Sequence, residues 1–185
     1  RVLGSTDSPA LDGGLTFNDL QLDNQEIGDA LLTFAPGSDR IELSVDAMNG
    51  KVTGQGFLIA SSNGRLSLEL KADAFRATPF LPKAQDGSTI HASLSANGNV
   101  SASWNKEQTT VQSRAQFDKT QIRWGRHELQ SDAPWSLTCN QTGCSLQDFN
   151  LAGGKSTIRI PSADFRKETT LDGQGQIDVD LLRIV

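Results

Sequence analysis

The fold is decided by a stretch in which apolar and polar residues alternate, residues 64–73, which read Gly-Arg-Leu-Ser-Leu-Glu-Leu-Lys-Ala-Asp. Successive side chains of a β-strand point to opposite faces of the sheet, so this pattern predicts a strand with one apolar and one polar face. The same alternation recurs in residues 41–47, 90–96, 111–117 and 177–181. The sequence therefore predicts an all-β protein.

Turn-forming dipeptides separate the alternating stretches. Asn-Gly occurs at residues 49–50, 63–64 and 97–98, Asp-Gly occurs at 86–87, and Gly-Gly occurs at 153–154. Asn-Gly is the strongest short signal for a β-hairpin, because both residues tolerate a positive φ. Runs and turns together predict roughly eleven to thirteen short strands, paired mostly antiparallel.

The alternation leaves open what lies against the apolar faces. We expect a long, strongly curved, mostly antiparallel sheet that forms an open groove, but a β-sandwich or a closed barrel places alternate residues inside equally well. Gly54-Gln55-Gly56 and Gly173-Gln174-Gly175 favour curvature, because glycine within a strand marks a bulge, a bend or a close backbone approach. No linker divides the chain, so a single β-rich domain over residues 1–185 is expected. The opening at Arg1, without an initiator Met, and the apolar ending 181–185 favour a segment excised from a longer, repetitive protein.

The two cysteines lie in the hexapeptide Cys139-Asn140-Gln141-Thr142-Gly143-Cys144. Asn140 and Gly143 are turn formers, so the segment reads as a hairpin whose strand ends a disulfide can bridge. Two free thiols beside a turn are the alternative. Two cysteines do not complete a zinc site. A disulfide would place the domain in an oxidising compartment, either the periplasm or the outside of the cell.

Motifs for catalysis or cofactor binding are not found. The formal net charge of −5 disfavours general nucleic-acid binding. His91 stands on the polar phase of an expected strand and His127 in an expected turn, and no Gly-x-Ser-x-Gly occurs. The acids of residues 19–26 do not have the spacing of a calcium loop, and neither Gly-x-Gly opens a helix. We therefore expect no enzyme, no cofactor, no metal and no nucleic-acid partner.

Three stretches resemble passages of the TamB/AsmA family of bacterial envelope proteins. Residues 64–75, running into Thr78-Pro79-Phe80-Leu81-Pro82, are similar to that family's strand followed by an apolar-x-x-apolar-Pro segment. Residues 86–98 resemble its Gly-led strand, and residues 133–182 resemble a repeat passage. The likeness covers residues 11–183.

The resemblance implies a periplasmic location, as part of a long protein anchored in the inner membrane and reaching the outer one. Proteins of this family are built from repeated curved β-sheet that forms an apolar groove. They are implicated in phospholipid movement and outer-membrane biogenesis, and several are linked to a barrel-assembly partner. The expected partners are therefore phospholipid acyl chains, a barrel-assembly protein and neighbouring repeats of the same chain.

The alternating apolar residues are the candidates for lining such a groove. They are Ile41, Leu43, Val45, Leu66, Leu68, Leu70, Ile90, Leu94, Phe117, Ile177 and Val179. The alternative is a secreted or periplasmic β-sandwich that acts as a binding or assembly module and has no lipid groove.

Overall fold

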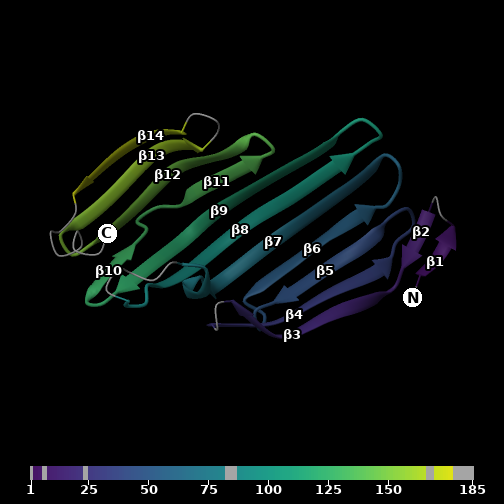
Figure 1. The fold of residues 1–185 in the computed structure, drawn as a ribbon, viewed down its shortest axis with the longest axis horizontal. Coiled ribbons are helices and arrows are strands. Elements are labelled where there is room, and N and C mark those ends of the chain that lie inside the picture. Colours follow the sequence, from purple (N-terminus) through teal and green to yellow (C-terminus); the bar gives the residue numbers. More distant parts are fainter. Residues whose placement is uncertain (1, 6–7, 23–24, 82–86, 166–168, 177–185) are drawn as a thin grey trace. The chain divides into compact units, whose positions relative to one another are not determined.

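The computed structural model describes residues 2–5, 8–22, 25–81, 87–165 and 169–176, with side chains between residues 11 and 165 of these ranges (Figure 1). The strands up to residue 76 are β1 (Val2–Ser5), β2 (Ser8–Leu11), β3 (Gly13–Leu22), β4 (Gln25–Pro36), β5 (Ile41–Ala47), β6 (Val52–Ile59) and β7 (Gly64–Arg76). A 3₁₀-helix, η1 (Thr78–Phe80), precedes β8 (His91–Trp104), β9 (Thr109–Trp124), β10 (His127–Gln130), β11 (Trp135–Asn140), β12 (Gly143–Gly153), β13 (Ser156–Phe165) and β14 (Thr169–Gln176).

Twelve of these strands form one sheet, in the order β14-β13-β12-β10-β9-β8-β7-β6-β5-β4-β3 (Figure 1). β11 lies off this path and pairs with β12 and β9. Neighbouring strands are mostly consecutive in the chain, as expected where short turns join antiparallel strands. No pairing joins β3 to β14 among the described residues, and the other sheet found there is the two-stranded β1–β2. The all-β, antiparallel prediction is confirmed.

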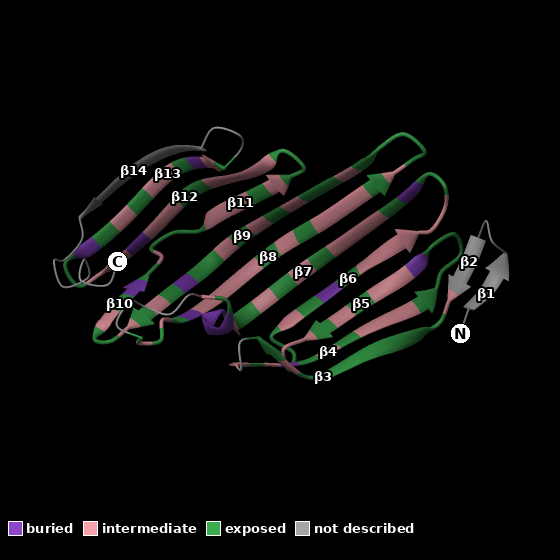
Figure 2. Ribbon diagram, viewed as in Figure 1, coloured by how far each residue is buried: buried purple, intermediate pink, exposed green. Residues whose placement is uncertain are grey.

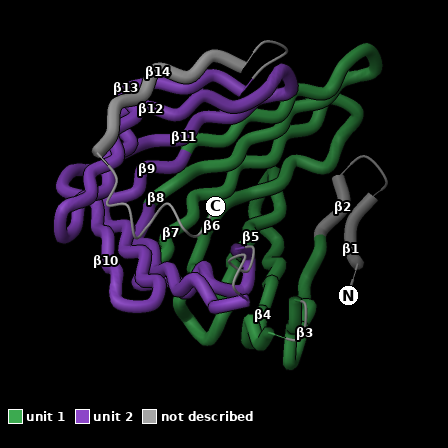
Figure 3. Tube along the Cα trace, turned by 60° about the vertical axis from the view of Figure 1, so that its left-hand side comes forward, with its two compact units in different colours: residues 1–72, 97–114 green, residues 73–96, 115–185 purple. Residues whose placement is uncertain are grey.

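The residues fall into two compact units, coloured separately in Figure 3. Unit 1 comprises residues 1–72 and 97–114, and unit 2 comprises residues 73–96 and 115–185. β7, β8 and β9 contribute residues to both. The expectation of a single domain stays a prediction.

The pairing of β4, β5, β6 and β7 sorts the side chains of unit 1 onto two faces. Directly paired residues of antiparallel strands point to the same side of a sheet. Three apolar rows therefore cross the four strands: Leu32, Val45, Gly54 and Leu70; then Phe34, Leu43, Gly56 and Leu68; then Pro36, Ile41, Leu58 and Leu66. The residues between them form rows on the opposite side: Leu31, Asp46, Thr53 and Lys71; then Thr33, Ser44, Gln55 and Glu69; then Ala35, Glu42, Phe57 and Ser67. We call these two sides the apolar face and the polar face of unit 1.

Few side chains of the described chain are fully buried. The buried hydrophobic residues are Ile41, Ala77, Ala92, Leu129, Leu151 and Ala163. Most other strand positions with apolar side chains are only partly buried, as the intermediate colour along the strands in Figure 2 shows. A core packed between two layers would bury whole rows of Leu, Ile and Phe side chains. The described residues contain no such fully buried row.

Glycine in β6 permits a close approach of two strands. A Cβ built on Gly56 would collide with the backbone oxygen of Ser67 and lie 2.8 Å from the Cα of Leu68. A Cβ on Gly54 would lie 2.6 Å from the Cδ2 of Leu70. Gly54 and Gly56 therefore allow β6 to approach β7 closely. A close backbone approach is one of the features that glycine within a strand predicts, beside a bulge and a bend.

The predicted disulfide is present at the end of a hairpin. Cys139 and Cys144 are directly paired residues of β11 and β12, with Cα atoms 4.0 Å apart, and a disulfide joins them. The amide of Thr142 in the connecting turn donates a hydrogen bond to Oδ1 of Asn140 at 2.8 Å. Asn140 thus closes the turn that brings the two thiols together.

Candidate functional site

The apolar face of unit 1 brings together six of the predicted lining residues. Ile41 pairs with Leu58, which pairs with Leu66. Leu43 and Leu68 both pair with Gly56, and Val45 and Leu70 both pair with Gly54. The predicted lining residues that share this face are Ile41, Leu43, Val45, Leu66, Leu68 and Leu70.

Most side chains on this face are neither buried nor fully exposed. Ile41 is 4% exposed, whereas the other five residues of the set are of intermediate exposure. Leu15 and Phe17 of β3 pair with Leu32 and Ala30 and so extend the same face, and they remain 51% and 48% exposed. A second layer packed on these residues would bury them. Within the described residues, the apolar face of unit 1 is therefore exposed to solvent where β3 forms its edge.

Three further candidates lie in unit 2. Ile90 precedes β8 and Leu94 lies within it, and both are partly buried. The ring of Phe117 in β9 stacks on Trp135, with centroids 3.8 Å apart and planes at 9°, and Trp135 meets Phe149 edge-on at 5.1 Å. One face of the Phe117 ring is thus covered by protein. Ile177 and Val179 lie outside the described residues.

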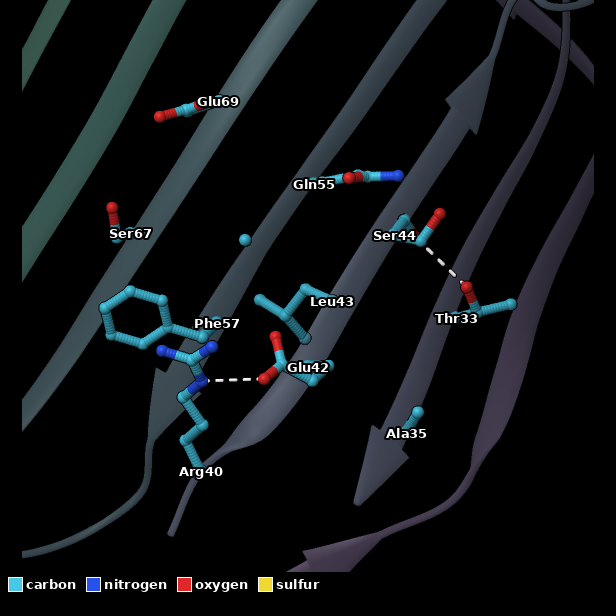
Figure 4. A pocket seen from close by; sticks show the side chains of 11 residues that line it. Thr33, Ala35, Arg40, Glu42, Leu43, Ser44, Gln55, Phe57, Ser67 and Glu69 are labelled. Carbon is cyan, nitrogen blue, oxygen red and sulfur yellow. Dashed lines mark hydrogen bonds and ion pairs between the residues drawn. The ribbon is translucent and has the colours of Figure 1, made fainter. Parts of the chain in front are cut away.

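A polar hollow opens on the other face of unit 1. Figure 4 shows that Thr33, Ser44, Gln55 and Glu69 reach it from four neighbouring strands. Its volume is about 430 Å³. No sequence motif predicts this hollow, which polar residues of the four strands line together with Ala35, Leu43, Gly56 and Phe57.

An arginine and an aromatic ring border the polar hollow. The Nε of Arg40 donates to Oε1 of Glu42 at 2.6 Å, and the Arg40 guanidinium lies 4.7 Å from the ring centroid of Phe57 (Figure 4). The guanidinium of Arg65 lies 5.8 Å from the same centroid. The lining offers hydrogen-bond donors and acceptors rather than a continuous apolar surface, so it suits polar groups and not an acyl chain.

Among the described residues, the two histidines are not hydrogen-bonded to a nucleophilic side chain. His127 is paired with Trp124, and the two rings lie 5.9 Å apart. His91 lies at the start of β8. Within the described residues, neither imidazole is hydrogen-bonded to a Ser, Thr or Cys side chain, and no group of three or more His, Cys, Asp or Glu residues could hold a metal ion.

The chain has no match among protein-family models, curated proteins or solved structures. The likeness to the TamB/AsmA family therefore rests on the residues quoted for it and stays a prediction. No helix within the described ranges has the length and apolar character needed to cross a bilayer.

Proposed function

We propose that the apolar face of unit 1 carries the acyl chains of phospholipids. On this proposal the chain is a segment of a TamB/AsmA-like periplasmic protein, anchored in the inner membrane, that moves phospholipid between the inner and outer membranes. Support for outer-membrane biogenesis, together with a barrel-assembly partner, belongs to the same proposal. The observation that carries it is the row structure of the face, in which partly exposed Leu, Val and Phe side chains recur across four strands.

The geometry of the rows suits an extended hydrocarbon. Neighbouring strands are about 4.8 Å apart, so a row that crosses four strands spans roughly 14 Å. Residues on one face of a strand repeat about every 6.8 Å, so parallel rows form a continuous apolar surface. An acyl chain that lies along a row contacts one apolar side chain on each strand, except on β6 where Gly54 or Gly56 provides none.

The energetics allow binding without trapping. Burying one methylene contributes about 0.8 kcal/mol, so about fifteen methylenes contribute at most about 12 kcal/mol. An acyl chain on an open face keeps one side in water, so it gains roughly half of this burial free energy. Each step along the surface exchanges one aliphatic contact for a similar one, which lets the chain slide. No specific polar site is needed for the tail.

The disulfide supports the periplasmic part of the proposal. Disulfides persist in oxidising compartments such as the bacterial periplasm and are rare in the cytosol. The Cys139–Cys144 bridge closes a hairpin of unit 2. This agrees with an oxidising location, in the periplasm or at the cell exterior.

Site-specific photo-crosslinking to lipid tests the proposal. A photo-reactive residue at Leu66 or Leu68 reports on the apolar face, and the same residue at Ser67, between them on the same strand, or at Ser44 reports on the polar face. After irradiation with phospholipid and extraction, we expect lipid adducts at the two leucine positions, at least about fivefold above the two serine positions. Equal labelling on both faces, or adducts at the serine positions alone, would contradict the proposal. Protein adducts at the leucine positions without lipid would favour the binding or assembly module instead.

A further inference from the structure

A second depression lies in unit 2 and is lined largely by hydrogen-bond donors. Its volume is about 230 Å³, and its lining residues are Arg76, Thr78, His91, Ala92, Ser93, Gln121 and Arg123. This volume is several times the roughly 30 Å³ that one water occupies in the liquid. Among the described residues, the lining contains two arginines and a histidine and no carboxylate.

The floor of the depression is fixed by hydrogen bonds between η1 and β8. The amide of Ala77 donates to the carbonyl oxygen of Ala92 at 2.9 Å, and the amide of Ala92 donates to Oγ1 of Thr78 at 3.1 Å. Thr78 is 2% exposed and Ala92 is 7% exposed. A buried, hydrogen-bonded floor positions the side chains around it.

The two arginines have no acidic partner within the part of the chain that the structure describes. Among the described residues, neither Arg76 nor Arg123 forms an ion pair or a side-chain hydrogen bond. Glu128 is the cross-strand neighbour of Arg123, but its Oε1 accepts a hydrogen bond from Nε2 of Gln121 at 2.7 Å. Arg76 and Arg123 are both exposed.

We propose that this depression binds a phosphate group between the guanidinium groups of Arg76 and Arg123. A guanidinium presents parallel N–H donors that match the oxygens of a phosphate, and two of them neutralise its charge. His91, Ser93 and Gln121 line the same space and can donate further hydrogen bonds. The phosphate is supplied either by a free phosphate or phosphate ester, or by the headgroup of an anionic lipid. The site is carried by residues other than the apolar face of unit 1, so it stands independently of the proposed acyl-chain function.

Binding is measured on the full chain in two arms. In the first arm, NMR signals of the arginine Nε–H groups are followed while inorganic phosphate replaces chloride at constant ionic strength. In the second arm, the protein is sedimented with vesicles of equal parts phosphatidylcholine and phosphatidylglycerol. The test variant is Arg76→Gln/Arg123→Gln, and the matched control is Arg159→Gln, an exposed arginine of β13 outside the depression. Far-UV circular dichroism checks that both variants are folded.

We expect saturable binding that weakens at least about tenfold in the double variant and less than about twofold in the control. Arginine-dependent binding of inorganic phosphate identifies a free phosphate group as sufficient. Arginine-dependent binding to vesicles alone identifies the headgroup as the source. No saturable binding in either arm, or an equal loss in the Arg159→Gln variant, overturns the proposal. Lipid crosslinking at Leu68 is expected to stay unchanged in the double variant, which separates this site from the acyl-chain proposal.

Discussion

Gly56 illustrates how a single residue sets the spacing of two strands. Its missing side chain lets β6 approach the backbone of β7 so closely that a Cβ would collide with the backbone oxygen of Ser67. The colliding atom belongs to the backbone, which cannot move aside without disturbing the ladder of hydrogen bonds. The indole of Trp104 lies over Gly64 in a similar way, and its Nε1 donates to the carbonyl oxygen of Ser61 at 3.0 Å.

We predict that Gly56→Ala destabilises the protein by about 1–3 kcal/mol, because the added methyl forces β6 and β7 apart. The control is Gly14→Ala in β3, where the nearest atom to a built Cβ is the backbone oxygen of Leu32 at 3.3 Å. There we expect a change below about 1 kcal/mol, since a shift of a few tenths of an ångström is enough. Urea unfolding followed by circular dichroism measures both. Equal destabilisation of the two variants would show that the close approach is not the cause.

At the scale of the element, single residues in the left-handed region interrupt the regular alternation of three strands. Asp19, Ala74 and Asp148 each have a positive φ within a strand, at 52°, 46° and 58°. In β12, Leu146 pairs with Leu137 before Asp148, and Phe149 contacts Trp135 after it. Trp135 and Leu137 lie two residues apart on β11 and so point to the same side. The apolar residues of β12 therefore stay on one face although their spacing changes from even to odd.

We predict that Ala74→Gly stabilises the protein by about 1 kcal/mol, because alanine pays a steric cost in the left-handed region that glycine does not. The hydrogen bond from the Ala74 amide to Oγ of Ser95, at 3.0 Å, is retained in this variant. Ala72→Gly, two residues earlier on β7, is expected to destabilise by about 0.5–1 kcal/mol, since that position lies outside the left-handed region. The two urea midpoints should move in opposite directions. A lower urea midpoint for Ala74→Gly would contradict the claim that Ala74 is strained by its positive φ.

The residues with a positive φ within strands are also the part of the fold that the sequence does not predict. The alternation of residues 64–72 was enough to predict β7 and its apolar face. The change of phase between Ala72 and Phe75 is visible in the sequence, but a turn and a bulge produce the same change. Asp at a left-handed position is common, whereas Ala is not, so Ala74 carries no local signal. The disulfide could be predicted because Asn140 and Gly143 supply a recognisable turn between its cysteines.

At the scale of the whole molecule, both candidate sites depend on pairing between strands. The rows of the apolar face require the register of β4 to β7, which fixes which of Ile41, Leu43 and Val45 meets which leucine. Period-two alternation predicts the face of each residue but not its neighbours on other strands. The phosphate site draws Arg76, His91 and Arg123 from β7, β8 and β9, so no local motif indicates it.

The central claim is that acyl chains lie on the apolar face of unit 1, and methyl NMR with a spin-labelled phospholipid tests it most directly. A nitroxide on the acyl chain broadens methyl signals that lie within reach of it. Leu31 is the control, because it lies on the polar face and is 41% exposed, more than Leu66 or Leu68. We predict strong broadening of the Val45, Leu66 and Leu68 methyls while the methyls of Leu31 and Thr53 stay sharp. Broadening of Leu31 equal to that of Leu68 would mean that the lipid follows exposure alone, and the account of the apolar face would be wrong.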